Sequence, residues 1–165
     1  MDLGTAFAYT VRRRPGAEAF VESSRRVSYG FWYEEIRTLA GGLAETGLRP
    51  GDTLAVVMRN RYEMASLYWA CQLSGLVFAP LSWRGTADEL AYCLADCEAA
   101  AIAYDDAAGA AAPEAAARTG LAGERCIAAA GAPGEGTTYR RLLEGKAIAV
   151  PVGPDEEAIS LMLYT

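Results

Sequence analysis

Three short apolar runs recur along the middle of the chain, and a segment with apolar residues at helical spacing follows each of the first two. The runs cover residues 54–58, 76–81 and 99–104. Short continuous apolar runs are typical of strands that are covered on both faces. Strands that alternate with helices in this rhythm form parallel sheets with right-handed crossovers. We therefore predict an α/β fold with an open, mainly parallel sheet of βαβαβ units and flanking helices.

A long helix is predicted ahead of the first run. Ser28 is a suitable N-cap residue, and the helical pattern continues to about Thr46, where Gly47 suits a left-handed position and Pro50 prevents continuation. The apolar positions of this pattern are Phe31, Trp32, Ile36, Leu39, Ala40 and Leu43. Gly41-Gly42 lies inside the pattern, and we interpret this pair as a point of close packing against a neighbouring element.

The two helices between the runs carry N-terminal signals. Asn60 with Glu63, and Thr86 with Glu89, both have capping-box spacing. Gly75 suits the end of the first of these helices. Pro80 lacks an N–H group, so it is expected near the end of its strand.

Outside these βα units, the sequence patterns that predict helices and strands are weaker. A hairpin is predicted over 19–28 with a turn at 22–26, followed by the βα units over 29–104. Residues 105–150 form a variable stretch, in which we predict a short helix at 113–119, a strand at 126–130 and a helical turn at 139–143. A final apolar strand is expected within 155–165.

Composition and charge argue against membrane-spanning, secreted and nucleic-acid-binding proteins. The chain has 165 residues, 52% of them apolar, and a net charge of −6. No apolar run is long enough to span a bilayer and no signal peptide is recognisable, so a cytoplasmic protein is expected. The acidic balance argues against a nucleic-acid partner. Arg12-Arg13-Arg14 and Arg25-Arg26 are local exceptions, either as solvated surface or as a patch for an anionic partner.

Several kinds of catalytic site are disfavoured. The chain has no histidine, so Ser-His-Asp and Cys-His catalysis are excluded for these residues. Its four cysteines, which are Cys71, Cys93, Cys97 and Cys126, are interpreted as small buried hydrophobic residues, and no metal site is expected. The glycine-rich segment 131–136 is interpreted as a linker. The acidic pairs at 34–35, 105–106 and 156–157 are interpreted as solvated surface, and no catalytic residue is predicted.

Two residues remain as candidates for ligand contact. Arg84 follows the second run, at the strand end where open α/β sheets bind ligands. Its guanidinium suits a phosphate or carboxylate, while a salt bridge or stacking on Trp83 are equally valid interpretations. Thr165 ends the last apolar segment after Tyr164, and a strand that ends in threonine commonly leads into a phosphate-holding loop.

The order of several segments resembles the adenylate-forming enzymes, the AMP-dependent synthetases and ligases. Residues 27–32, Val-Ser-Tyr-Gly-Phe-Trp, are similar to the segment that opens the family's first long helix. Residues 47–58 resemble its Gly-Asp strand entry, and 75–84 its second βα unit, with Ser82 where the family often has Asn. Residues 86–104 and 155–165 also resemble the family, whereas 105–150 match poorly. The resemblance implies that residues 1–165 are a partial amino-terminal domain, with 155–165 leading toward a phosphate loop.

The resemblance also implies an activity. An acyl-CoA synthetase of this family would activate a fatty or aryl acid with ATP and Mg²⁺ and transfer the acyl group to coenzyme A. Of this chain's residues, Thr165 maps onto a nucleotide contact, and Arg84 lies on the coenzyme A side. The family's phosphate-loop lysine, magnesium-binding glutamate, ribose-binding aspartate and catalytic lysine would lie beyond residue 165. These 165 residues alone are therefore expected to be inactive and to bind no cofactor tightly.

Two other functions remain open from the sequence. One is the adenylation domain of a peptide synthetase, and the other is a non-catalytic α/β module that binds a nucleotide or a protein partner. The resemblance also implies that strands completing the family's sheet lie outside these residues, so an exposed apolar sheet edge that invites self-association is expected.

Overall fold

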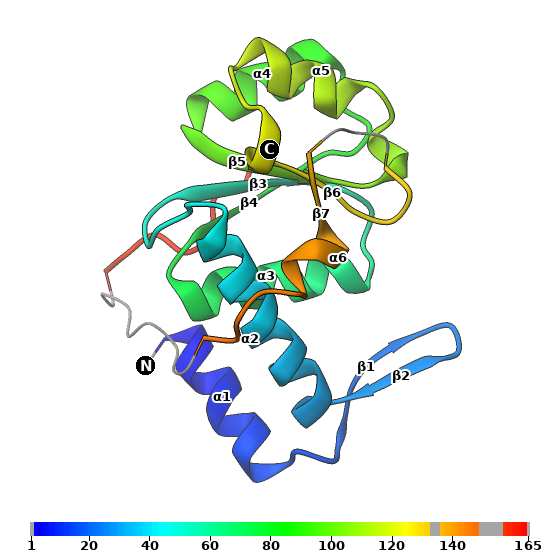
Figure 1. Cartoon of the computed structure of the whole chain (residues 1–165), viewed down its shortest axis with the longest axis vertical. Helices are drawn as coiled ribbons and strands as arrows, with labels where there is room; N and C mark the ends of the chain where they lie inside the picture. The colour runs from blue at the N-terminus through cyan, green and yellow to red at the C-terminus, as the bar shows by residue number, and fades with distance from the viewer. Residues whose placement is uncertain (1, 133–135, 149–156, 165) are drawn as a thin grey trace.

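A parallel β-sheet forms the centre of the molecule (Figure 1). A computed structural model describes residues 2–132, 136–148 and 157–164. Five strands pair in the order β4-β3-β5-β6-β7, and each pairing is parallel. Their bounds are β3 (Thr53–Val57), β4 (Val77–Leu81), β5 (Ala99–Tyr104), β6 (Cys126–Ala128) and β7 (Thr137–Thr138). The predicted open parallel sheet is confirmed.

Helices cover both faces of this sheet (Figure 1). One layer contains α2 (Tyr29–Glu45), α3 (Tyr62–Ser74) and α6 (Tyr139–Leu142), and the other contains α4 (Ala87–Asp96) and α5 (Ala111–Arg118). Side chains alternate along β3, so that Leu54 and Val56 join the core under α2 and α3. Ala55 and Val57 join the core under α4 and α5. Among the described residues, no helix is long and apolar enough to cross a membrane.

An additional helix and a hairpin extend this layout away from the sheet. Helix α1 (Leu3–Arg13), which the sequence did not predict, packs through Phe7, whose ring stacks on Trp69 at 4.3 Å between centroids. Strands β1 (Glu18–Glu22) and β2 (Arg25–Ser28) pair antiparallel. The predicted turn at 22–26 was too wide, because only Ser23 and Ser24 lie outside the strands. Two 3₁₀ turns, η1 (Asp106–Ala108) and η2 (Gly123–Arg125), complete the elements.

The N-terminal ends of three helices test the capping residues predicted from the sequence. Ser28 accepts a hydrogen bond from the Phe31 N–H, and Thr86 forms the predicted capping box with Glu89. The capping box predicted at Asn60 was wrong, because α3 begins at Tyr62 and its N-cap residue, Arg61, makes no side-chain cap. The carboxylate of Glu22 in the hairpin accepts a hydrogen bond from the Tyr62 N–H at 3.2 Å instead. A long-range contact thus replaces the local cap.

Two other apolar predictions need correction. Phe31 was expected on the buried face of α2, but it is 62% exposed. The final apolar segment was expected to form a strand, but in its described part only Leu161 bridges to β4, in parallel with Phe78. Its pairing is therefore shorter than predicted.

Two glycines bring α2 against the segment that contains α6. A Cβ atom added to Gly41 would lie 1.8 Å from the carbonyl oxygen of Lys146, and one on Gly42 would lie 2.2 Å from that of Leu142. Both clashes involve backbone atoms, which a side-chain rotation does not relieve. The interpretation of Gly41-Gly42 as a close-packing point is confirmed.

Gly42→Ala is expected to destabilise the chain because α6 would have to move away from α2. The loss should be about 1–3 kcal/mol, which at this chain length lowers the melting temperature by several degrees. Gly16→Ala is the matched control, since a Cβ there meets nothing within 4 Å. Equal melting temperatures for the two variants in thermal unfolding would contradict this account.

Candidate functional site

The carboxyl ends of β3, β4 and β5 define the candidate site. The chain passes from β3 to β4 on one side and then crosses to β5 on the other side of β3. In open α/β sheets, ligands bind outside the carboxyl ends of the strands near such a reversal. The residues that follow these three strands here are 58–61, 82–86 and 105–108.

A buried carboxylate joins the loops at this reversal. The side chain of Asp105 is fully buried. One of its oxygens accepts hydrogen bonds from the Arg59 N–H and the Arg61 guanidinium, both at 3.2 Å, and the other accepts from the Ala107 N–H at 3.0 Å. A buried charge is costly unless it is paired and hydrogen-bonded. These three donors therefore stabilise the buried carboxylate of Asp105. The prediction that Asp105 is solvated surface was wrong.

Further charges surround this carboxylate. Arg59 pairs with Asp106 at 2.8 Å, and Arg61 pairs with Glu63 at 2.8 Å. Burial alone would lower the pKa of Arg61, but its hydrogen bonds and charge interactions with Glu63 and Asp105 outweigh burial and raise that pKa. Two arginines and three carboxylates therefore form a closed network. It fixes the β3–α3 loop to the end of β5 and offers no free cation to an anionic ligand.

Arg84 lies beyond the end of β4 and is exposed. Its guanidinium carbon lies 4.0 Å from the ring centroid of Trp83, which is close enough for a cation–π contact. No carboxylate in the described part of the chain pairs with it. Of the three interpretations from sequence, stacking on Trp83 is observed, and the guanidinium edge is left facing solvent.

The last described residues run beside β4 toward this same edge. Phe78 donates its N–H to the Ser160 carbonyl at 3.1 Å and accepts from the Met162 N–H at 3.0 Å. The Tyr164 hydroxyl donates to Asp96 on α4 at 2.7 Å. Because the bridge to β4 is parallel, the segment points to the carboxyl edge of the sheet. Thr165, the predicted phosphate contact, lies outside the described residues.

An apolar groove of about 620 Å³ opens beside this segment. Exposed leucines Leu161 and Leu163 form one wall, and Val21 of the hairpin lies opposite with half of its surface accessible. The remaining lining residues are Phe20, Glu22, Asn60, Arg61, Met64, Ala65, Tyr68, Phe78 and Pro80. Such uncovered apolar surface is suited to association. Self-association through this edge stays a prediction.

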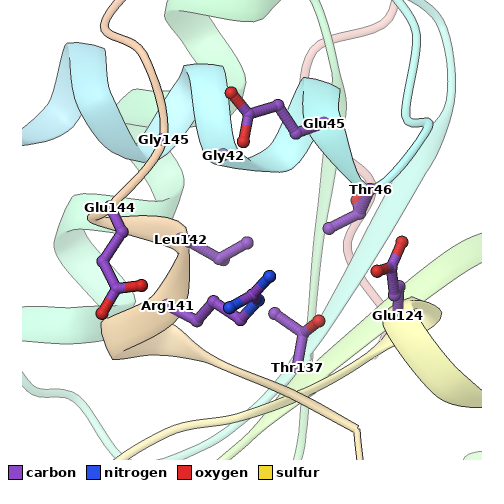
Figure 2. Close-up of a pocket in the computed structure, with 9 residues that line it drawn as sticks. All are labelled: Gly42, Glu45, Thr46, Glu124, Thr137, Arg141, Leu142, Glu144 and Gly145. Atoms are coloured by element: carbon purple, nitrogen blue, oxygen red, sulfur yellow. The ribbon is translucent and has the colours of Figure 1, made fainter.

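A second cavity, of about 340 Å³, lies at the opposite edge of the sheet. Figure 2 shows Arg141 extending into it, with Glu45, Glu124 and Glu144 around it. The other lining residues are Gly42, Thr46, Thr137, Leu142 and Gly145. The lining residues come from the end of α2, the turn before β6, the start of β7, and α6 with the turn after it, so the cavity faces the amino ends of the strands. This is not the edge at which α/β sheets bind nucleotides.

Cys71 and Cys97 are buried as predicted, whereas Cys93 and Cys126 are only partly buried. All four are free of disulfides, and burial raises the pKa of each thiol. Raised pKa values keep the thiols protonated, whereas metal binding needs thiolates. Within the described ranges, no group of three or more acidic or cysteine side chains is placed to hold a metal ion.

Comparison with known families identifies the chain. The family model described as AMP-binding enzyme matches residues 7–165. This chain belongs to the AMP-binding enzyme family. The resemblance inferred from the sequence is thereby confirmed.

Individual relatives match only in part. Over 104 residues, which are 63% of this chain, it is 31% identical to 8% of a delta-poly-L-ornithine synthetase from Acinetobacter baumannii. Over 102 residues, 62% of this chain, it is 31% identical to 21% of a feruloyl-CoA synthase from Amycolatopsis. The chain thus spans a small part of the curated relatives it matches.

A solved structure agrees with the fold over the whole chain. The R395G mutant of coronafacic acid ligase from Pectobacterium brasiliense superposes with a TM-score of 0.90 at 19% identity, covering 100% of this chain and 33% of that structure. At this identity the likeness concerns the fold alone. The parallel sheet of this chain therefore has a known architecture.

The Asp105 network was missed although a signal existed. Asp105 directly follows a buried strand, and polar residues at the carboxyl ends of neighbouring parallel strands meet at one edge. The buried role of Asp105 was not predicted, because an acidic pair such as Asp105-Asp106 is typical of solvated surface. In the structure the two residues differ: Asp105 is buried, and Asp106 is half exposed.

Asp105→Ala is expected to destabilise the chain by about 2–4 kcal/mol, because Arg61 and the Arg59 N–H would lose a buried partner. Asp106→Ala removes a half-exposed carboxylate from the same network and should cost less than about 1 kcal/mol. Urea unfolding of both variants measures the difference. Equal, small losses would show that the buried carboxylate does not hold these loops.

Proposed function

We propose that the chain is the amino-terminal part of an acyl-CoA synthetase that activates a carboxylic acid. The family match over residues 7–165 carries this proposal. The feruloyl-CoA synthase relative supports an aryl acid substrate and coenzyme A as acceptor. The four free cysteines support a reducing compartment, the cytoplasm.

The proposed reaction has two steps. A carboxylate oxygen attacks the α-phosphorus of ATP, the bond to the β-phosphate breaks, and pyrophosphate leaves. The thiol sulfur of coenzyme A then attacks the acyl carbonyl carbon, and AMP leaves as the acyl–oxygen bond breaks. Such chemistry depends on positioning and charge stabilisation. Mg²⁺ would neutralise phosphate charge, held by residues expected beyond 165.

The residues of this chain would position the reactants. The segment 157–164 lies against β4 and points to the carboxyl edge of the sheet, which supports a nucleotide contact for Thr165. The closed network around Asp105 would keep the neighbouring loops fixed during turnover. Arg84 would face the coenzyme A side with its guanidinium oriented by Trp83.

The coding sequence beyond codon 165 provides the first test. A continuation into a loop like Ser-Gly-Thr-Thr-Gly with a Pro-Lys nearby supports the proposal, and a stop codon after Thr165 overturns it. The complete product should catalyse acid-dependent exchange of pyrophosphate into ATP. The 165-residue chain alone should give none, and exchange by that chain would contradict the assignment of catalytic groups beyond it.

Arg84→Ala in the complete enzyme is expected to raise the KM for coenzyme A several-fold and to leave pyrophosphate exchange unchanged. The reason is that Arg84 would contact the second substrate only. Arg49→Ala is the matched control, because Arg49 is exposed before β3 at the amino edge of the sheet. A loss of exchange activity, or an unchanged KM, would remove Arg84 from the coenzyme A side.

An adenylation domain of a peptide synthetase is the second candidate. It is favoured by the match to the delta-poly-L-ornithine synthetase. Amino acids, rather than aryl or fatty acids, would then support pyrophosphate exchange, and a carrier domain would follow in the coding sequence. A non-catalytic module is the third candidate, for which ATP or AMP would raise the melting temperature of the 165-residue chain without any exchange.

A further inference from the structure

Three consecutive arginines lie at the end of α1, and this end of the helix lies away from the sheet (Figure 1). Arg12, Arg13 and Arg14 are all exposed, in a chain whose net charge is −6. In the described part of the chain, none of them pairs with a carboxylate. Cations suit the C-terminus of a helix, which accounts for one or two of them. Three unpaired arginines in an acidic protein need a further reason.

The surface around them is aromatic rather than acidic. Arg13 and Arg14 line a depression of about 400 Å³ together with Tyr9, Thr10, Ala17, Glu18 and Tyr29. The one carboxylate in this set, Glu18, already pairs with Arg26 at 2.6 Å. The Arg13 guanidinium carbon lies 5.6 Å from the Tyr9 ring centroid. Arg13 is therefore held beside a ring, and its guanidinium stays available to an external anion.

Two exposed aromatic side chains lie at the same end of the molecule. Tyr9 is 50% exposed and Phe31 is 62% exposed. Phe31 is next to Gly30, whose N–H donates to the Pro15 carbonyl at 2.8 Å, directly after the arginines. An exposed phenylalanine beside unpaired cations matches an interface between an anionic layer and an apolar interior.

A second basic group in the chain has more acidic surroundings. Arg140, Arg141 and Lys146 are also exposed. Around Arg141, however, three glutamates line the same cavity (Figure 2). Three carboxylates thus line the cavity at Arg141, whereas Glu18 is the one carboxylate that lines the depression at Arg13 and Arg14. We call Arg12, Arg13, Arg14, Tyr9 and Phe31 the basic end.

We propose that the basic end docks on the anionic phospholipid headgroups of a membrane surface. The arginines contact lipid phosphate and carboxylate groups, while Phe31 and Tyr9 enter the interfacial layer. Nucleic acid is the weaker alternative, because three cations on a protein of net charge −6 supply few phosphate contacts. This inference does not depend on which acid the enzyme activates.

Vesicle co-sedimentation of the purified product of the complete coding sequence tests the proposal. Binding is expected to vesicles of phosphatidylcholine mixed with phosphatidylserine, not to phosphatidylcholine alone, and should weaken as salt rises. Each arginine near an anionic surface contributes about fivefold in partitioning, so Arg12→Gln, Arg13→Gln and Arg14→Gln together should reduce it by about a hundredfold. Phe31→Ser should reduce the remaining, salt-resistant part.

The matched control changes the same number of charges elsewhere. Arg140→Gln, Arg141→Gln and Lys146→Gln together should leave partitioning within a few-fold of the parent protein, and melting temperatures check that both triple variants fold. Equal losses in the two triple variants, or no binding to the mixed vesicles, would overturn the proposal. Single-stranded RNA that binds through the three arginines, without vesicle binding, would overturn it as well.

Discussion

The complete burial of β3 is the constraint on which the rest of the structure depends. All five of its residues are buried, and it pairs with β4 on one side and β5 on the other. Successive side chains of β3 pack alternately into the two separate hydrophobic cores, so helices must cover both faces of the sheet. The position of β3 between β4 and β5 also creates the topological reversal. The chain passes from β3 to β4 on one side and later reaches β5 on the other side. Both the layers and the candidate site thus follow from one strand.

Local patterns predicted most of this framework because they act over a few residues. The apolar runs, the Ser28 cap, the Thr86 capping box and the left-handed Gly75 each depend on neighbours in sequence. The failures occurred where distant residues decide. Glu22 from the hairpin caps α3 in place of Asn60, and α1 is stabilised by aromatic packing on α2 and α3. Neither partnership can be inferred from spacing along the chain.

The candidate site was less predictable for the same physical reason. Arg84 was located correctly at the end of a strand, since strand ends are visible in the apolar pattern. The role of Asp105 depends instead on Arg59 and Arg61, more than 40 positions earlier, which become its neighbours when β3 and β5 pair. The groove beside Leu161 and Leu163 likewise exists because the last segment lies on the edge of β4. Sequence gave the residue types, and the sheet order determined which of them meet.

Three surfaces of the molecule differ in how their charged side chains are paired: the carboxyl edge of the sheet, its amino edge and the basic end. At the carboxyl edge, the Asp105 network uses its own cations, so an anionic ligand there must be held by Arg84 or by groups outside the described residues. At the amino edge, Arg141 is surrounded by glutamates. At the basic end, no carboxylate in the described part of the chain pairs with the arginines. A charge that folding leaves unpaired is available to a partner, so the basic end is suited to bind an anionic surface.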